Sequence, residues 1–143
     1  MSLYDRVPVI VMLSGAFALA AGCAAQTPTL QYAPAVVRVS GTVVFEEHYG
    51  PPGFGENPAT DTRVRVPVLH LDRFIRVPAP GRGGINSATA DTVNRLGLLG
   101  LSIDWPRYGG KHVVLEGTLF QRETANQITA VMMQVRRVVR GHL

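Results

Sequence analysis

Short apolar segments broken by glycine constrain this chain more than any other feature. Val36 to Phe45 and His112 to Phe120 are rich in β-branched and aliphatic residues, and each holds a glycine near its middle. The surroundings of these glycines are similar: Val-Ser-Gly-Thr-Val around Gly41 and Leu-Glu-Gly-Thr-Leu around Gly117. A glycine weakens a strand unless it marks a bulge or a sharp bend, as the strands of a barrel need. The repeated pattern therefore predicts curved β-strands.

Further strands are predicted between and after these two. In Arg63 to Leu71, alternation places Val64, Val66, Val68 and His70 on one face of a strand. Pro67 predicts an edge position or a bulge, because proline cannot donate to a β-ladder. Phe74 to Val77 is a short continuation or a separate strand.

The second half of the chain is less uniform. Val93 to Ile103 is ambiguous, because its leucines fit a helix whereas Gly97 and Gly100 disfavour one. Asp104 to Gly110 predicts a turn or one helical turn, and Gln127 to Val139 is the longest strand candidate. The whole pattern predicts an all-β fold, a small five-to-six-stranded barrel similar to the OB-fold. A small β-sandwich is the alternative.

The first 22 residues differ in character from the rest. Arg6 is followed by an uncharged run from Val7 to Ala21, too short to span a bilayer well, since spanning takes about 20 apolar residues. Small residues precede Cys23, the only cysteine. This ending resembles a bacterial lipobox, which implies a signal peptide over 1–22 and a lipid on Cys23. A secreted protein cut at a nearby Ala-x-Ala site and an uncleaved anchor are the alternatives.

The lipobox resemblance also implies a location. It places the protein in the cell envelope, anchored to a membrane through its N-terminal lipid and facing the periplasm. Ala24, rather than aspartate, after the cysteine favours the outer membrane in a bacterium with two membranes. Residues 26–35 are polar and contain prolines, so residues 23–35 are predicted to be a flexible tether and residues 36–143 the β-barrel domain.

The charge balance narrows the partners. The formal net charge is +4, and no run of five or six like charges occurs. Nucleic-acid binders carry basic residues clustered on one face, so no nucleic-acid partner is expected. An envelope protein or a glycan is the expected partner.

The stretch His48 to Asp61, HYGPPGFGENPATD, is the first candidate site. A phosphate-binding loop needs consecutive backbone N–H donors, and three prolines in this stretch lack them, so the phosphate interpretation fails. Two interpretations remain for its aromatic residues. His48, Tyr49 and Phe54 either cap one end of the barrel or form an aromatic-lined lip for a ligand or partner.

A second candidate follows the ambiguous segment. Trp105, Arg107 and Tyr108 are residue types that stack on a sugar or a base. The alternative, which the pattern favours, is that Trp105 plugs one end of the barrel.

Histidines and carboxylates are too few for a predicted metal site. Glu46 and His48 point to one face of a strand, but two ligands do not make a site, and a solvated strand end is the simpler interpretation. His70 continues an apolar face, which predicts a hydrogen-bonded histidine at the rim or in the core. We expect no metal and no cofactor.

A longer set of motifs is similar to one bacterial family. The stretch from Tyr49 to Asp61, then Val68 to Asp72, then Gly110 to Val113, and finally Gly117 to Phe120 resemble the domain of unknown function 4431. The resemblance runs from about residue 39 to residue 138. It implies a small exported β-barrel domain and carries no assigned activity.

No catalytic pattern accompanies these features. The sequence lacks Gly-x-Ser-x-Gly and His-Glu-x-x-His, and Cys23 is the expected lipid attachment point, so no enzyme and no catalytic residue are predicted. The leading hypothesis is a non-catalytic binding or assembly-support module in the cell envelope. The alternatives are an oligosaccharide- or nucleotide-binding OB module and an inhibitor of an envelope hydrolase such as lysozyme.

Overall fold

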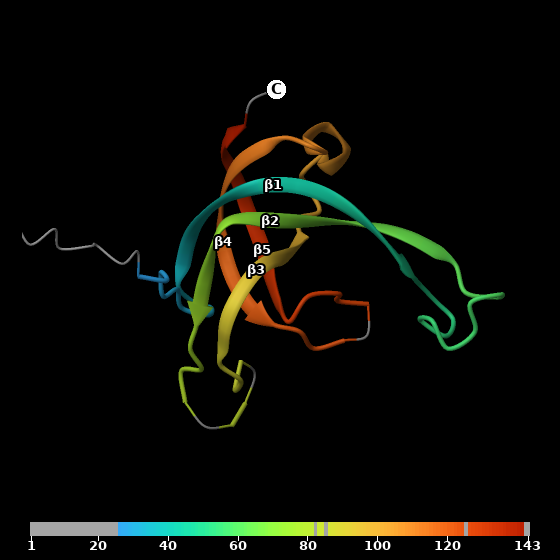
Figure 1. Ribbon diagram of the computed structural model, residues 1–143, viewed down its shortest axis with the longest axis horizontal. Helices are drawn as coiled ribbons and strands as arrows, with labels where there is room; N and C mark the ends of the chain where they lie inside the picture. The colour runs from blue at the N-terminus through green and yellow to red at the C-terminus, as the bar shows by residue number, and fades with distance from the viewer. Residues whose placement is uncertain (1–25, 82, 85, 125, 142–143) are drawn as a thin grey trace, which may run out of the picture.

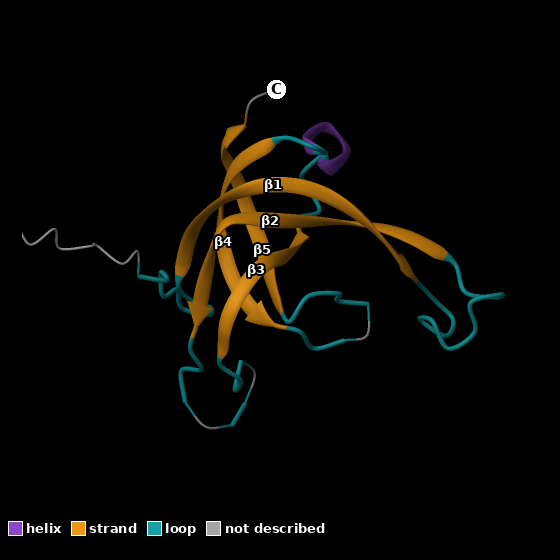
Figure 2. Cartoon of the chain, in the orientation of Figure 1, coloured by secondary structure: helices purple, strands orange, loops and turns teal. Residues whose placement is uncertain are grey.

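The computed structural model describes residues 26–141, apart from residues 82, 85 and 125. It contains β-strands and one short helix (Figure 2). In chain order the elements are β1 (Val36–Tyr49), β2 (Arg63–Val77), β3 (Ala90–Leu99), the 3-10 helix η1 (Trp105–Tyr108), β4 (His112–Gln121) and β5 (Val131–Gly141). The predicted all-β class is confirmed.

The five strands form one mixed sheet that closes into a ring in the order β1-β2-β3-β5-β4 (Figure 1). Neighbouring strands are antiparallel except β3 and β5, which run parallel. β1 closes the ring because it pairs with β4 from Val36 to Thr42 and with β2 from Gly41 to Tyr49. A β-sandwich needs two facing sheets, so that alternative is wrong.

The same steric constraint explains why glycine occupies positions 41 and 117 within the strands. A Cβ atom on Gly41 would overlap the carbonyl oxygen of His70 on β2, and one on Gly117 would overlap that of Gln134 on β5. The β4–β5 pairing also shifts register between Glu116 and Gly117. The neighbouring strands approach too closely at both places for any side chain.

Alternate residues from all five strands fill the interior of the ring. The largest fully buried side chains of this interior are Leu69, Leu96, Leu115, Leu119, Met133, Val43, Val77, Val113 and Val131. Burying a leucine or valine side chain stabilises a fold by about 1.5–3 kcal/mol. This apolar interior is the main source of stability for the ring.

The uncertain segments resolve as strands with irregular edges. Phe74 to Val77 continues β2, across register shifts against β3. Pro67 lies just beyond Val68, the first β2 residue paired with β3, so the edge position is confirmed. The ambiguous segment is the strand β3, and its Gly97 N–H donates to Thr129 Oγ1 at 2.7 Å.

The last strand is shorter than predicted. β5 begins at Val131 instead of residue 127, and its 11 residues are fewer than the 15 of β2. The Thr129 hydroxyl donates to the Val131 carbonyl at 2.6 Å and accepts from Gly97, so side-chain bonds replace a β-ladder there.

Part of the expected tether packs on the ring. The Leu30 N–H donates to the Arg76 carbonyl at 2.8 Å, and the Ala33 N–H donates to the Leu119 carbonyl at 2.7 Å. Tyr32 is only 4% exposed and donates its hydroxyl to the Ala88 carbonyl. Residues near 28–33 therefore belong to the packed domain.

The expected signal peptide and Cys23 lie outside the described residues. Among the residues that are described, no helix is long and apolar enough to cross a membrane.

Candidate functional site: the arm and its groove

β1 and β2 continue beyond the ring as a two-stranded arm (Figure 1). The β1–β4 pairing ends at Thr42 and the β2–β3 pairing begins at Val68, so residues 45–49 and 63–67 form ladder pairs only with each other among the described residues. We call these residues the arm, and residues 50–62, which connect its strands, the Tyr49 loop. Because the arm has no third strand, both of its edges are free of strand partners.

Asp61 organises the Tyr49 loop from inside. Its carboxylate accepts hydrogen bonds from three backbone N–H groups, those of Gly53 at 2.7 Å, Gly55 at 2.8 Å and Asn57 at 3.2 Å. Asp61 is 8% exposed. The loop therefore does gather N–H donors as an anion-binding loop would, but the anion is its own carboxylate.

The same contacts set the charge state of Asp61. Burial raises the pKa of its carboxyl group, but the bonds from the Gly55, Gly53 and Asn57 N–H groups outweigh burial and hold the pKa below the ordinary value. The carboxylate is thus charged at neutral pH and keeps the loop in one conformation.

The fixed loop displays one aromatic ring outward. Phe54 has a φ of 51°, a backbone conformation that a bulky residue rarely adopts, and its side chain is 40% exposed. The next residue, Gly55, has a φ of 105°, where glycine has no steric cost. An apolar ring held at the surface in this way favours a contact role.

A groove of about 650 Å³ lies beside the Tyr49 loop. It runs between this loop and the connection from β4 to β5. Its lining residues are Glu47, His48, Tyr49, Gly50, Pro51, Phe54, Val64, Val66, Leu99, Asn126 and Ile128. The structure therefore brings the predicted residues His48, Tyr49 and Phe54 together around one mostly apolar hollow, which we call the Tyr49 groove.

A polar cluster lies next to the groove, around Glu46. The carboxylate lies 3.0 Å from His70 Nε2, 2.9 Å from Arg95 Nη1 and 3.4 Å from His48 Nε2. Burial raises the pKa of Glu46, but the contacts with His70 and His48 and the charge of Arg95 lower it overall. The predicted convergence of Glu46 and His48 is confirmed, and His70 is an exposed, hydrogen-bonded residue and not part of the core.

Arg95 is the main partner of the Glu46 carboxylate in this cluster. In the described part of the chain, no three His, Cys, Asp or Glu side chains are placed to hold a metal ion. Arg95 satisfies the carboxylate of Glu46 through two hydrogen bonds, at 2.9 and 3.0 Å.

Of the two interpretations of Trp105, the structure favours the plug over a residue that stacks on a ligand. It is only 9% exposed, lies in the core cluster, and meets Tyr108 edge to face at 6.5 Å between ring centroids. A ligand has no access to stack on it, and its position agrees with a plug at one end of the ring. Arg107 is exposed and Tyr108 is half-buried, but neither lines the Tyr49 groove.

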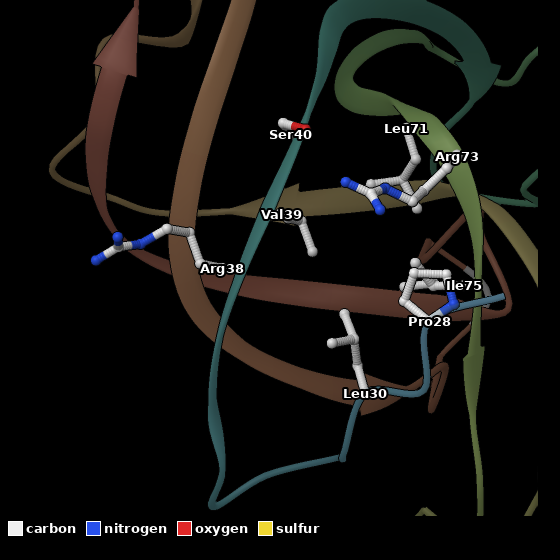
Figure 3. A pocket seen from close by; sticks show the side chains of 8 residues that line it. All are labelled: Pro28, Leu30, Arg38, Val39, Ser40, Leu71, Arg73 and Ile75. Atoms are coloured by element: carbon white, nitrogen blue, oxygen red, sulfur yellow. The ribbon is translucent and has the colours of Figure 1, made fainter. Parts of the chain in front are cut away.

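A smaller pocket, of about 220 Å³, lies at the other end of the β1–β2 pairing, where the two strands separate beyond the Gly41–Leu71 pair (Figure 3). Leu30 from the N-terminal segment, Val39 from β1 and Ile75 from β2 surround it. Arg38 extends away from this gap and bonds Glu116 at 2.8 Å. The N-terminal segment thus fills a gap between two strands, a packing role that its sequence does not predict.

Comparison with known proteins adds one family and no function. Residues 101–138 match the family described as a domain of unknown function (DUF4431). This range holds η1, β4 and most of β5, so the expected resemblance is confirmed there, while the Tyr49 loop lies outside the match and its resemblance stays a prediction. No curated protein and no solved structure matches the chain.

Proposed function

We propose that this protein is a non-catalytic binding module that holds a partner in the Tyr49 groove. One observation carries the proposal: a hollow of about 650 Å³, walled mainly by apolar side chains and held by a loop that Asp61 keeps in place. Ligand sites are typically concave and mostly apolar, with a few polar groups that fix orientation. His48 and Asn126 supply such groups here.

We also propose that the ring is a barrel of the OB type. Its strand order and its mixture of antiparallel and parallel pairs support this assignment. OB-folds bind oligosaccharides and oligonucleotides between the loop that joins strands 1 and 2 and the loop that joins strands 4 and 5. The Tyr49 groove lies between the same two connections, which favours an oligosaccharide or nucleotide as a second candidate ligand, without a contribution from Trp105.

The lipid anchor remains a proposal of its own. The lipobox-like sequence before Cys23 supports it. The few residues between Cys23 and the ring would hold the ring close to the membrane. Five residue steps separate Cys23 from Pro28, which lines the pocket beside β1, so at most about 18 Å of chain separates lipid from ring. Mass spectrometry of the native protein should find an acylated cysteine at the N-terminus, and a Met1 start would contradict the anchor.

Co-purification of partners with variants of the protein tests the Tyr49 groove. Val66→Arg places a charge in the groove, while Arg136→Gln changes an exposed β5 residue far along the chain. We expect the full chain to co-purify its envelope partners, the Val66 variant to lose at least about nine-tenths of them, and the Arg136 variant to keep them. Circular dichroism verifies that both variants fold. Equal recovery with all three baits would reject the groove as the binding site.

A further inference from the structure

The face of the arm turned away from Val64 and Val66 carries two arginines stacked on aromatic rings. The strand register pairs Tyr49 with Arg63 and places Phe45 and Arg65 on the same face. The Arg63 guanidinium carbon lies 4.1 Å from the centre of the Tyr49 ring, and that of Arg65 lies 5.3 Å from the centre of the Phe45 ring. Arg63 also donates to the Tyr49 hydroxyl at 2.9 Å.

Neither arginine is neutralised by a carboxylate among the described residues. Ion pairs engage Arg38, Arg76, Arg95 and Arg137, but none within 4.0 Å involves Arg63 or Arg65 in that part of the chain. Glu47 lies opposite Arg65 in the strand pairing, yet no ion pair joins them. The arm therefore holds two exposed positive charges whose in-plane N–H donors are not occupied by an acidic side chain.

A cleft of about 590 Å³ opens beside Arg65, between the arm and η1. Its lining residues are Val43, Val44, Phe45, Arg65, Pro106, Gly109 and Gly110. Phe45 and Pro106 provide apolar surface, and Arg65 provides the only charged group of the lining. A guanidinium that stacks on a ring keeps its planar donors available for two-point bonding to a carboxylate or phosphate.

We propose that this cleft binds a ligand with an oxyanion group, a phosphate or a carboxylate, on a body of about the size of a sugar. Arg65 bonds the oxyanion, Arg63 adds positive charge at the neighbouring position, and the body packs on Phe45 and Pro106. This site is separate from the Tyr49 groove, since the two share no lining residue. The proposal therefore stands or fails independently of the proposed function.

Three monosaccharides of matched size test the site. The full chain, in non-ionic detergent and labelled with ¹⁵N, is titrated with glucose 6-phosphate, glucuronate and uncharged glucose. We expect the charged sugars to shift the Arg65 side-chain signal and the amides of Gly109 and Gly110, with binding that weakens as salt rises. Glucose should bind at least about tenfold more weakly, because it lacks the charge-assisted bonds.

Substitutions complete the test. Arg65→Gln should weaken binding of the charged sugars by about tenfold or more, as expected for loss of a charge-assisted hydrogen bond, and Arg136→Gln should leave it unchanged. Binding of only one charged sugar supports the proposal and identifies the anion that the cleft selects. Equal binding of glucose, or unchanged binding by the Arg65 variant, would overturn it.

Discussion

The ring and the arm use the same two strands for different purposes. Within the ring, β1 and β2 each have neighbours on both sides, and their inward side chains, such as Val39 and Leu69, are buried. In the arm the same strands pair only with each other; they expose Arg63 and Arg65, and the loop that joins them exposes Phe54. Stability thus resides where strands have two neighbours, and the proposed recognition surfaces lie where they have one.

The two faces of the arm also differ from each other in chemistry. One face lines the Tyr49 groove with Val64 and Val66, and the other carries Arg63 and Arg65 on aromatic rings. A strand presents alternate side chains to opposite faces, so one short hairpin supplies an apolar hollow and a cationic cleft. The two proposed sites therefore differ in chemistry although one hairpin forms both.

Truncation of a core leucine should give the largest effect on the ring. Leu115→Ala removes a fully buried side chain and should lower the free energy of unfolding by about 2–5 kcal/mol. Leu101→Ala, at a fully exposed leucine, should change it by less than about 0.5 kcal/mol. Urea unfolding measures both variants, and similar losses would contradict the assignment of stability to the interior of the ring.

Closure of the ring at Gly41 should be nearly as sensitive. Gly41→Ala drives a methyl group into the His70 carbonyl, and overpacking of this kind costs about 1–3 kcal/mol. Gly81→Ala is the matched control, since a Cβ there meets no atom within 4 Å. Thermal unfolding of the two variants compares them, and a Gly41 variant as stable as the control would show that the strands can separate without cost.

Loss of Asp61 should affect the arm and leave the ring intact. Asp61→Asn removes the charge that three N–H groups bind, so the amides of Gly53, Gly55 and Asn57 should exchange with solvent much faster. Glu56→Gln, a change in the same loop at an exposed side chain, should leave their exchange unchanged. If the amides of β4 and β5 exchange faster to the same extent, the loop and the ring form one cooperative unit, which would contradict the distinction between arm and ring.

The same carboxylate predicts a pH dependence for the loop. Because the folded-state pKa of Asp61 is lowered, its contribution is present above the ordinary pKa of about 4 and is lost as the pH falls through the lower folded value. Protection of the loop amides, corrected for the intrinsic pH dependence of exchange, should therefore fall at acid pH before that of the ring amides.

The smallest effect concerns an ion pair on the outside of the ring. Hydrogen bonds from Arg137 and Arg38 lower the pKa of Glu116 from 4.5 to about 2. Arg137→Gln should raise this pKa toward its ordinary value, whereas Arg136→Gln should not, as a carboxyl-carbon NMR titration can measure. The pair is solvent-exposed, so we expect almost no change in stability at neutral pH. An unchanged Glu116 pKa in the Arg137 variant would contradict the contact.

Local sequence patterns predicted the strands but few of the contacts that form the Tyr49 groove and the Glu46 cluster. Alternation of apolar residues and the glycines at 41 and 117 were sufficient for the strand segments, because both signals act within one strand. Ring closure was harder, since it depends on which strands become neighbours. The Glu46 cluster shows why: His70 and Arg95 come from other strands, and only the register of three strands brings them to one carboxylate.

The loop illustrates a second limit. Its prolines argue against a phosphate site, but three other N–H groups of the loop converge on Asp61, and this role of Asp61 depends on the folded conformation of the loop. The groove likewise needs Ile128, which lies far from Val66 in sequence. Trp105 shows the same limit, since an aromatic residue in a turn looks the same in sequence whether it faces solvent or the core; its 9% exposure agrees with the favoured interpretation, a plug of the ring.

Photo-crosslinking in the cells that produce the protein tests the central claim most directly. A photoreactive residue is placed at Ile128 in the groove, at Pro106 in the cleft, and at Arg136 on the outside of the ring. The account predicts adducts from the first two positions and none from the third. Adducts from position 136 alone, or the same adducts from all three positions, would contradict a division in which the ring supports the fold and the arm contacts partners.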